Sequence, residues 1–483
     1  MEITSIKRAA IWIFAGLGLA LAVISCCDMA DNYFVLTHPD ACIASSNGTH
    51  CAAEFRVARR SLGVVPQTPE QVTSAMIAAV QAQVTALIAA ADEIKTNNVR
   101  EDHFTNVMAR SCARQATIAL RYLGQAGDAV EAGTNQLDVP YWLAAADTQI
   151  DNCVDGFQTF SPAAQGFPAY VHLEYTAKKA GSTLEALLSI TNAAAKAVAS
   201  AATSLSSTEE DVAPVRGRRM AVRSSSTGNG AMDWLEEGLF VAFGIKFVNT
   251  AGPQNHQAVA FRATGDQTAL FNYAFEGSQD TLYVDAGRQY YKNCYIGGSQ
   301  DFIFGDAAVV IDAPKIQLHP SPSFGTLTAS GRAKDTPTGI VIRDAVVSAD
   351  KGTTKVYLGR PWKKCAFTVF INTFLPAVIE KDGWLSWNEG SCMFLAEAGS
   401  KGPGAASSRA DWVDPGIITS ASGYDANTFT QVNSWLKLSR KGFLLAHLIA
   451  GASRSSSSSR RFCSSHEHTR YAVGAGAPNP PRI

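Results

Sequence analysis

The sequence predicts two domains of opposite character, an all-α antiparallel helical bundle followed by a β solenoid. Three observations predict this division. Apolar residues recur at helical spacing before residue 200, a stretch rich in Ser, Gly and charge follows at 204–230, and short β-rich segments with an internal repeat begin after Gly238. The chain has 483 residues, which is enough for two or three domains.

The composition is that of a core-forming protein without a strong net charge. Hydrophobic residues make up 46% of the chain and charged residues 17%, which excludes a disordered protein. Lys and Arg number 41 against 42 Asp and Glu. No basic field therefore favours nucleic acid or an anionic membrane as a partner.

Residues 1–27 are predicted to be a secretory signal peptide or a signal anchor. Lys7 and Arg8 precede an apolar run at 9–24, which is slightly short for a membrane span of about 20 residues. The alternative for this run is a buried core helix. A sequon makes Asn47 a glycosylation site compatible with the secretory route.

Ten cysteines are ordinary in an oxidising compartment and a liability in the cytosol. Cys42 and Cys51 form one local pair, and Cys112 and Cys153 a longer one. Because no Cys or His cluster has zinc spacing, disulfides are expected, and neither a metal nor a cofactor is. The other cysteines of the mature chain have no evident partner in the sequence: Cys294, Cys365, Cys392 and Cys463.

The bundle is expected over 31–203. Thr68, Pro69 and Gln71 are typical of a helix start, with a capping residue, a proline at the first helical position and a glutamine two residues later. Ala- and Leu-rich segments follow at 114–132, 141–159 and 177–200. The bundle contains no convergent catalytic set, which favours a structural or interaction module. Its first helix carries an apolar stripe: Val72, Met76, Val80, Val84, Leu87 and Ile88.

The stretch 204–230 is expected to be an exposed linker, and it contains the dibasic pair Arg218 and Arg219. Composition alone leaves two interpretations open. The pair belongs either to a solvated charge run or to a site where a protease cuts the chain.

The repeat places polar residues in equivalent positions of neighbouring coils. Residues 275–283 recur as 296–304, so that Asp280 and Asp301 lie 21 residues apart, and Gln257 precedes Gln279 by 22. Equivalent positions of adjacent parallel coils are about 4.8 Å apart. Two carboxyls at that distance cannot both ionise freely, so one is expected to keep its proton near neutral pH.

This pattern predicts an active site with a carboxylate nucleophile and a neighbouring acid. Gln257 and Gln279 offer amide donors to an oxyanion, Arg360 offers a cation, and Trp362 offers a platform for a sugar ring. Two alternatives stay open at this point. The polar residues could form a ladder that only satisfies buried backbone, and two carboxyls could instead cleave a glycosidic bond.

Six ordered segments between Gly238 and Leu436 resemble the plant pectin methylesterases, a family of right-handed parallel β-helices. They are 249–253, 256–262, 279–283, 301–307, 358–362 and 402–405. The resemblance implies that Asp301 is the nucleophile, Asp280 the proton donor and Gln279 the stabiliser of the transition state. It also implies that Gln257, which serves the oxyanion too, contacts substrate together with Arg360 and Trp362.

The helical half resembles the inhibitor domain that precedes many members of this family. Its two successive cysteine pairs fit, as do 142–146 and 151–157. The resemblance implies proteolytic processing at Arg218 and Arg219. It further implies a secreted, cell-wall enzyme without a cofactor that hydrolyses the methyl esters of pectin, and we expect a monomer.

The sequence departs from the family at both ends of the second domain. We expect a β-helix domain over 231–436 that is N-terminally truncated, because the family's opening coils have no counterpart, and a disordered tail over 437–483. Ser278, Gln300 and Pro314 replace the family's usual Tyr, Val and Cys. The alternative function is therefore a catalytically impaired chain in which the bundle acts as an esterase inhibitor or binding module.

Overall fold

The computed structural model describes residues 69–97, 103–160, 166, 168–203, 240–243 and 246–436. These residues belong to two compact units that divide between Glu209 and Glu210. Several expectations fall outside the described residues: the signal region 1–27, Asn47, the Cys42–Cys51 pair, Arg218 and Arg219, and the tail 437–483.

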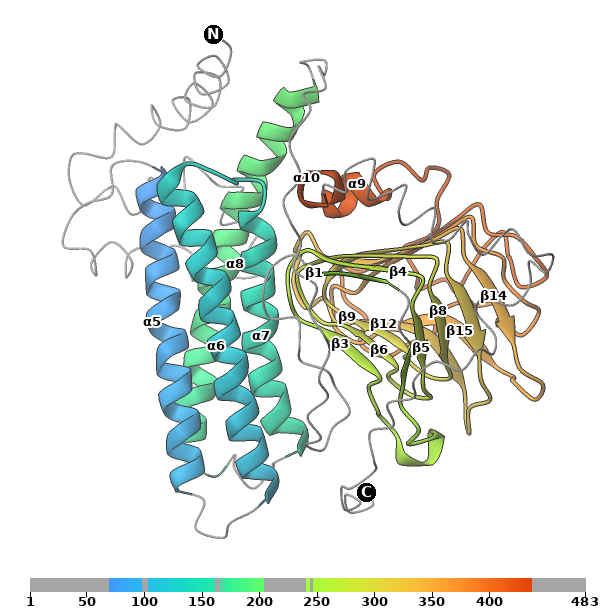
Figure 1. The fold of residues 1–483 in the computed structure, drawn as a ribbon, viewed down its shortest axis with the longest axis horizontal. Coiled ribbons are helices and arrows are strands. Elements are labelled where there is room, and N and C mark those ends of the chain that lie inside the picture. The colour runs from blue at the N-terminus through green and yellow to red at the C-terminus, as the bar shows by residue number, and fades with distance from the viewer. Residues whose placement is uncertain are drawn as a thin grey trace. The chain divides into compact units, whose positions relative to one another are not determined.

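The first unit consists of four long helices that lie side by side (Figure 1). They are α5 (Pro69–Thr96), α6 (His103–Ala132), α7 (Val139–Phe160) and α8 (Pro168–Thr203). The predicted start of α5 at Pro69 is confirmed. Five of the six residues of its predicted stripe are buried, and Ile88 is half-buried because the buried stripe continues through Ala91 and Ile94.

The predicted segments for α6 and α8 begin too late. Both helices start about ten residues earlier, in stretches where polar and aromatic residues hide the apolar period. Thr105 and Ala109 of α6, and Tyr170 and Leu173 of α8, are nevertheless buried. A disulfide between Cys112 and Cys153 joins α6 to α7, which is the predicted pairing.

Among the described helices, α5 is long and apolar enough over Glu70–Thr96 to cross a membrane. Length and composition alone cannot separate such a helix from the core helix of a bundle, since both need an apolar surface. Val80, Val84 and Leu87 of α5 are fully buried against the other helices. The burial is what a bundle helix requires.

The second unit is a parallel β-helix of three sheets, in which each coil adds one strand to each sheet (Figure 1). All pairings are parallel. The eight-stranded sheet contains β1 (Phe240–Phe243), β4 (Thr268–Phe271), β7 (Arg288–Lys292), β10 (Ala308–Asp312), β13 (Gly339–Arg343), β16 (Phe367–Ile371), β17 (Phe394–Ala398) and β18 (Pro415–Ile417).

The two other sheets have five strands each. One contains β2 (Lys246–Val248), β5 (Ala274–Glu276), β8 (Tyr295–Gly298), β11 (Lys315–Leu318) and β14 (Val346–Ala349). The other contains β3 (Phe261–Ala263), β6 (Leu282–Val284), β9 (Ile303–Gly305), β12 (Gly325–Ser330) and β15 (Val356–Pro361). A short 3-10 helix at Pro253–Asn255 precedes β3.

The coils are shorter before Asp301 than after it. Leu282 pairs with Ile303 at an offset of 21 residues, whereas Ile303 pairs with Thr328 at 25 and Thr326 with Tyr357 at 31. The predicted period in the low twenties is therefore right for the coils around 257–304 and wrong for the later ones. Longer corners add residues there without changing the strands that stack.

One corner of the β-helix has the same backbone conformation in coil after coil. The residue that follows each strand of the eight-stranded sheet has positive φ, between 50° and 56°, and its N–H donates to a carbonyl of the next coil. Asn and Asp tolerate this left-handed conformation better than other residues with a Cβ. The five residues in this corner row are Asn272, Asn293, Ala313, Asp344 and Asn372.

Two short helices cover part of the eight-stranded sheet, as Figure 1 shows. They are α9 (Ala426–Thr430) and α10 (Val432–Trp435), and the side chain of Asp425 caps the first by accepting from the N–H groups of Asn427 and Thr428. Val432 and Trp435 are buried against Val310 and other aliphatic residues of the sheet. The helices thus remove the outer apolar surface of these strands from water.

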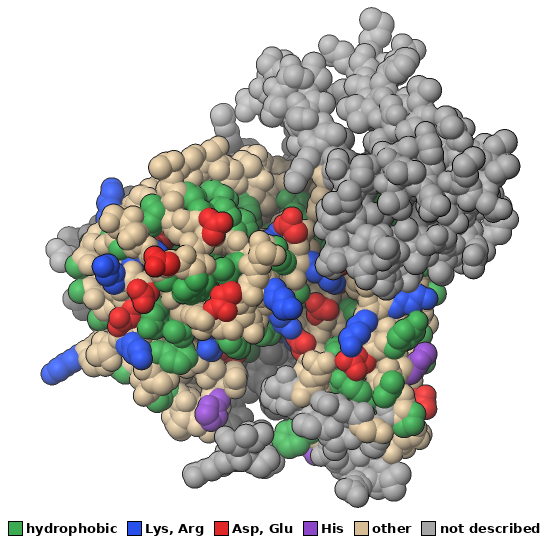
Figure 2. All heavy atoms as spheres, turned by 180° about the vertical axis from the view of Figure 1, so that it is seen from behind, with side chains coloured by type: hydrophobic (Ala, Val, Ile, Leu, Met, Phe, Trp, Pro, Cys, Tyr) green, Lys and Arg blue, Asp and Glu red, His purple; other side chains and the backbone are tan. Residues whose placement is uncertain are grey.

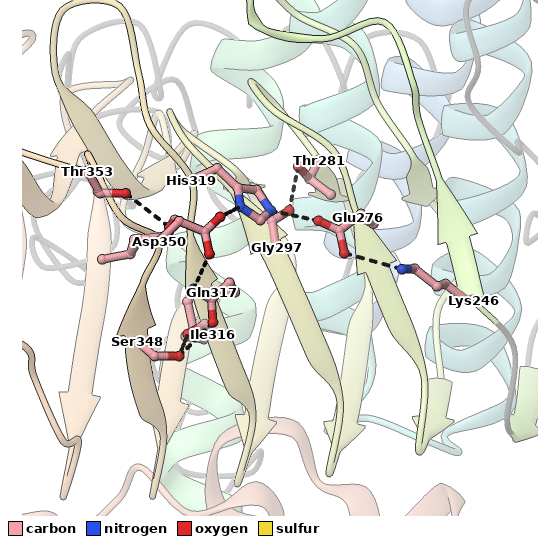
Figure 3. A network of polar contacts seen from close by, with 11 residues as sticks. Lys246, Glu276, Thr281, Gly297, Ile316, Gln317, His319, Ser348, Asp350 and Thr353 are labelled. Carbon is pink, nitrogen blue, oxygen red and sulfur yellow. Dashed lines mark hydrogen bonds and ion pairs between the residues drawn. The ribbon is translucent and has the colours of Figure 1, made fainter. Parts of the chain in front are cut away.

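A polar network crosses the outer face of the five-stranded sheet that begins with β2 (Figure 3). His319 lies between two carboxylates, with Nε2 2.6 Å from Glu276 Oε1 and Nδ1 2.7 Å from Asp350 Oδ2. Lys246 contacts Glu276, and Gln317 donates to Asp350. The hydrogen bond to Glu276 raises the pKa of His319; burial opposes this, and Asp350 adds to it.

Charged side chains of both signs are interspersed on the face seen in Figure 2. Inside the β-helix, two ion pairs are almost completely buried. Arg288 contacts Asp266 at 2.6 Å, and Arg409 contacts Glu397 at 2.5 Å. Each joins segments of different coils and thereby fixes their register.

Candidate active site

Asp280 and Asp301 occupy the same corner of adjacent coils. Asp280 lies between β5 and β6, and Asp301 lies between β8 and β9. The preceding residues, Gln279 and Gln300, form a parallel bridge, and the N–H of Asp280 donates to the carbonyl of Gln300 at 3.1 Å. Both aspartates have positive φ, 61° and 49°. The register therefore places the two carboxyls side by side, as the repeat predicts.

Asp301 is held from two directions. Its side chain is buried, with the residue 5% exposed. The Thr326 hydroxyl donates to Asp301 Oδ1 at 2.7 Å and accepts from the Asp301 N–H at 2.8 Å. Arg360 donates from Nε to Oδ1 at 3.0 Å and from Nη2 to Oδ2. A two-pronged contact of this kind orients the carboxylate and favours its negative charge.

Asp280 is in a different environment. It is half-buried, and no group in the described part of the chain hydrogen-bonds to its carboxyl. Burial raises the pKa of Asp280 well above its usual value; the charge of Asp301 raises it further, and Arg360 partly opposes both. One carboxyl of the pair is thus biased towards the acid form beside a carboxylate that is fixed in place.

Three glutamines line up beside this pair. Gln257 bridges to Gln279, and Gln279 bridges to Gln300, in successive coils. Gln257 is exposed, and the other two are half-buried. The sequence predicted the first two as amide donors and treated Gln300 only as a departure from the family. The register extends the row of amides by this third side chain.

Arg360 is enclosed by aromatic rings as well as by Asp301. Its guanidinium carbon lies 4.0 Å from the ring centre of Trp387 and 5.2 Å from that of Phe324. A cation over a ring face is stabilised by the electrons of the ring. The cation is therefore restricted in position on several sides.

Trp362 belongs to an aromatic group next to the pair. Tyr283 and Phe304 occupy paired positions of β6 and β9 and stack with centres 4.3 Å apart. The Trp362 ring meets both edge-on, at 6.5 Å and 6.1 Å. Trp362 is half-buried, so its ring keeps exposed surface. The predicted site residues Asp280, Asp301, Gln279, Gln257, Arg360 and Trp362 thus all lie on the same part of the β-helix.

A second pair of aspartates, Asp285 and Asp306, also lies in adjacent coils, 21 residues apart. Both are engaged in structural contacts. Asp285 accepts from Arg262 at 2.7 Å, and Asp306 accepts from the Thr338 hydroxyl at 2.5 Å. Equivalent position alone therefore does not identify a reactive pair; the surroundings do.

Sequence reasoning missed Thr326, Phe324 and Trp387. Thr326 contacts Asp301 through a coil that is 25 residues long and outside the visible repeat. Trp387 is an exposed tryptophan in an irregular segment, and no periodic pattern connects it with Arg360. The disulfide between Cys365 and Cys392 was missed as well, because these cysteines share no motif.

Comparison with known proteins places this site in a family. Residues 205–437 match the model of the pectinesterase family. The chain belongs to the pectinesterase family. Its helical half is similar to a second family, the plant invertase/pectin methylesterase inhibitors, over residues 37–173.

Relatives of this pectinesterase come from plants. Pectinesterase 2 of Citrus sinensis is 38% identical over 241 residues, which cover 46% of this chain and 47% of the relative. Pectinesterase 5 of Arabidopsis thaliana is 39% identical over 236 residues, which cover 46% and 38%. The chain thus spans about half, or less, of the length of these relatives. The structure of pectin methylesterase from carrot matches with 35% identity and a TM-score of 0.40, covering 44% of this chain and 72% of that one.

Proposed function

We propose that the chain hydrolyses methyl esters of pectin, a methylated homogalacturonan, and releases methanol and a carboxylate. The observation that carries the proposal is the unequal pair. Asp301 is buried and fixed as a carboxylate by Arg360 and Thr326, and Asp280 beside it has a pKa raised by burial and by the charge of Asp301. A nucleophile and an acid are thus next to each other.

In the proposed mechanism Asp301 attacks the ester carbonyl carbon. The carbonyl π electrons move to oxygen, and the amides of Gln279 and Gln257 stabilise the resulting oxyanion. When the oxyanion collapses, the bond to the methoxy group breaks, and Asp280 gives its proton to the departing methanol. A water molecule then attacks the acyl-enzyme, Asp280 takes a proton from it, and Asp301 leaves as a carboxylate. Substrate would be held by Arg360 and Trp362.

The environment of Asp280 argues against a purely structural ladder. A ladder residue donates to or accepts from buried groups, as Asp285 and Asp306 do. Within the described residues the Asp280 carboxyl has no such bond. A half-buried acid without a structural contact, beside a fixed carboxylate, is better explained by chemistry.

Methanol release from methylated pectin tests the proposal. Asp301→Asn should lower the rate by at least about 1,000-fold, because an amide cannot act as the nucleophile, and Asp280→Asn by about 100-fold. Asp344→Asn is a matched control, since Asp344 also has positive φ but lies in the corner row. Near-normal methanol release by Asp301→Asn would refute the assignment. New reducing ends or unsaturated products would indicate a glycosidase or a lyase instead.

A second proposal concerns the helical unit, whose match to an inhibitor family supports it. We infer that the bundle can inhibit a pectin methylesterase or serve as a binding module. The full-length Asp301→Asn chain provides the test, because it contributes no methanol of its own. Added to an active pectinesterase, it should lower methanol release in proportion to its concentration. An unchanged rate at large excess would exclude inhibition.

The route of the protein is proposed from the sequence. We propose domains at 31–203 and 231–436, secretion to the cell wall directed by residues 1–27, glycosylation at Asn47, a Cys42–Cys51 disulfide and a monomeric state. A processing protease would cut at Arg218 and Arg219. Expression of the full chain in plant cells should yield a shortened wall-bound product, and replacing both arginines by glutamine should abolish the shortening.

A further inference from the structure

The segment 384–392 runs alongside β15 and the residues that follow it. Its first residue, Trp384, is almost completely buried and bridges to Gly359. The next residue, Leu385, donates its N–H to the carbonyl of Gly359 at 3.0 Å. Asn388 donates its N–H to the carbonyl of Pro361 at 3.2 Å. The segment is therefore attached to β15 on both sides of Trp387.

The far end of this segment is attached by a covalent bond. Cys392 forms a disulfide with Cys365. Cys365 is itself fixed to the preceding coil, because its N–H donates to the carbonyl of Arg332 at 3.1 Å and its own carbonyl accepts from Arg332 Nη1 at 3.2 Å. Close packing accompanies the crosslink, since a Cβ on Gly390 would lie 2.3 Å from the carbonyl oxygen of Lys364.

Trp387 lies between these attachments and covers Arg360. The guanidinium carbon of Arg360 is 4.0 Å from the centre of its ring. Trp387 is 43% exposed, so burial in the core does not fix its position. What holds the ring over Arg360 is the backbone of the segment, together with the attachments before and after it.

We propose that the Cys365–Cys392 disulfide is a positioning element for the ester hydrolysis: it holds Trp387 over Arg360 and thereby keeps the guanidinium on Asp301. This inference rests on the proposed function. The disulfide undergoes no reaction in it. Its effect is geometric, because a loosened segment lets Trp387 leave Arg360 and the two-pronged contact with Asp301 is then less often formed.

The test removes the disulfide with the double variant Cys365→Ser/Cys392→Ser. The turnover number for methanol release should fall by about tenfold, which is less than the ~100-fold that a 1 Å misplacement can cause, and the KM should change less. The alkaline limit of activity should move to higher pH. Arg360 opposes the raised pKa of Asp280, and its charge would be held less firmly near that acid.

A coupling experiment separates positioning from general stability. If the disulfide acts through Trp387, the loss in turnover should disappear in a Trp387→Leu background, where removing the disulfide should change the rate less than twofold. A persistent tenfold loss in that background would overturn the inference. The matched control is Cys112→Ser/Cys153→Ser, which removes a disulfide from the helical unit and should leave the pH limit unchanged.

Hydrogen exchange judges the inference independently of activity. In the Cys365→Ser/Cys392→Ser variant, the N–H groups of Leu385 and Asn388 should exchange faster, while those of β9 and β12 should keep their rates. Unchanged exchange in 385–391 would overturn the positioning role even if turnover fell. If the unaltered chain released no methanol, the proposed function would fail, and the exchange result would still decide whether the disulfide holds this segment.

Discussion

Replacing Ala313 by Asn should stabilise the β-helix. Ala313 has φ 52° and is the one member of the corner row that is neither Asn nor Asp. The left-handed conformation costs a residue with a Cβ roughly 1–2 kcal/mol, and Asn recovers part of this through local hydrogen bonds. We expect a gain of about 0.5–1 kcal/mol, which raises the Tm of a unit of this size by roughly 1–4 °C.

The neighbours of Ala313 leave room for the new side chain. Asn293 and Asp344, its equivalents in the adjacent coils, are exposed, and Asn372 already donates to Asp344 at 3.1 Å. Calorimetry of the full chain measures the change. Asn293→Ala is the mirror control and should lower the Tm by a similar amount. The reasoning is refuted if Ala313→Asn leaves the Tm unchanged or lowers it while Asn293→Ala lowers it.

Three further predictions concern the oxyanion and the network on the outer face. Gln279→Leu should lower the turnover number about 100- to 1,000-fold with little change in KM, as measured by methanol release. Because the pKa of His319 is raised, its contacts with Glu276 and Asp350 stabilise the fold fully below pH 6.5, and this stability is lost as pH rises through the raised pKa. His319→Gln should therefore flatten the dependence of Tm on pH above 6.5. Gly297→Ala should flatten it too, since its Cβ would lie 2.6 Å from Glu276 Oε1 and 2.8 Å from His319 Nε2.

The helical unit shows what periodicity can predict and where it stops. Val80, Val84 and Leu87 lie on the buried side of α5 because a regular stripe marks the face that must leave water. The first turns of α8 escaped prediction, since Val171 and Tyr175 are exposed there and give the stretch no apolar face. Tertiary packing of Tyr170 and Leu173, and not helix propensity, sets that end.

The same limit applies to the β-helix. The aspartate pair could be predicted because the coils between Gln257 and Phe304 have nearly equal lengths, so equivalent residues recur at a fixed spacing. The later coils differ in length, and no spacing connects Thr326 with Asp301. Cys365 and Cys392 meet for a similar reason, because an irregular segment returns to the side of β15.

Unequal coil lengths also explain how two identical residues acquire different roles. In the repeat Asp280 and Asp301 are interchangeable, and nothing in its pattern says which is the nucleophile. The difference comes from the longer coils that follow Asp301, which supply Thr326 and Arg360 to that carboxyl alone. Asp280 keeps only Asp301 as a charged neighbour in the adjacent coil, and its pKa rises. The regular coils therefore create the pair, and the irregular ones divide its members into a fixed carboxylate and an acid.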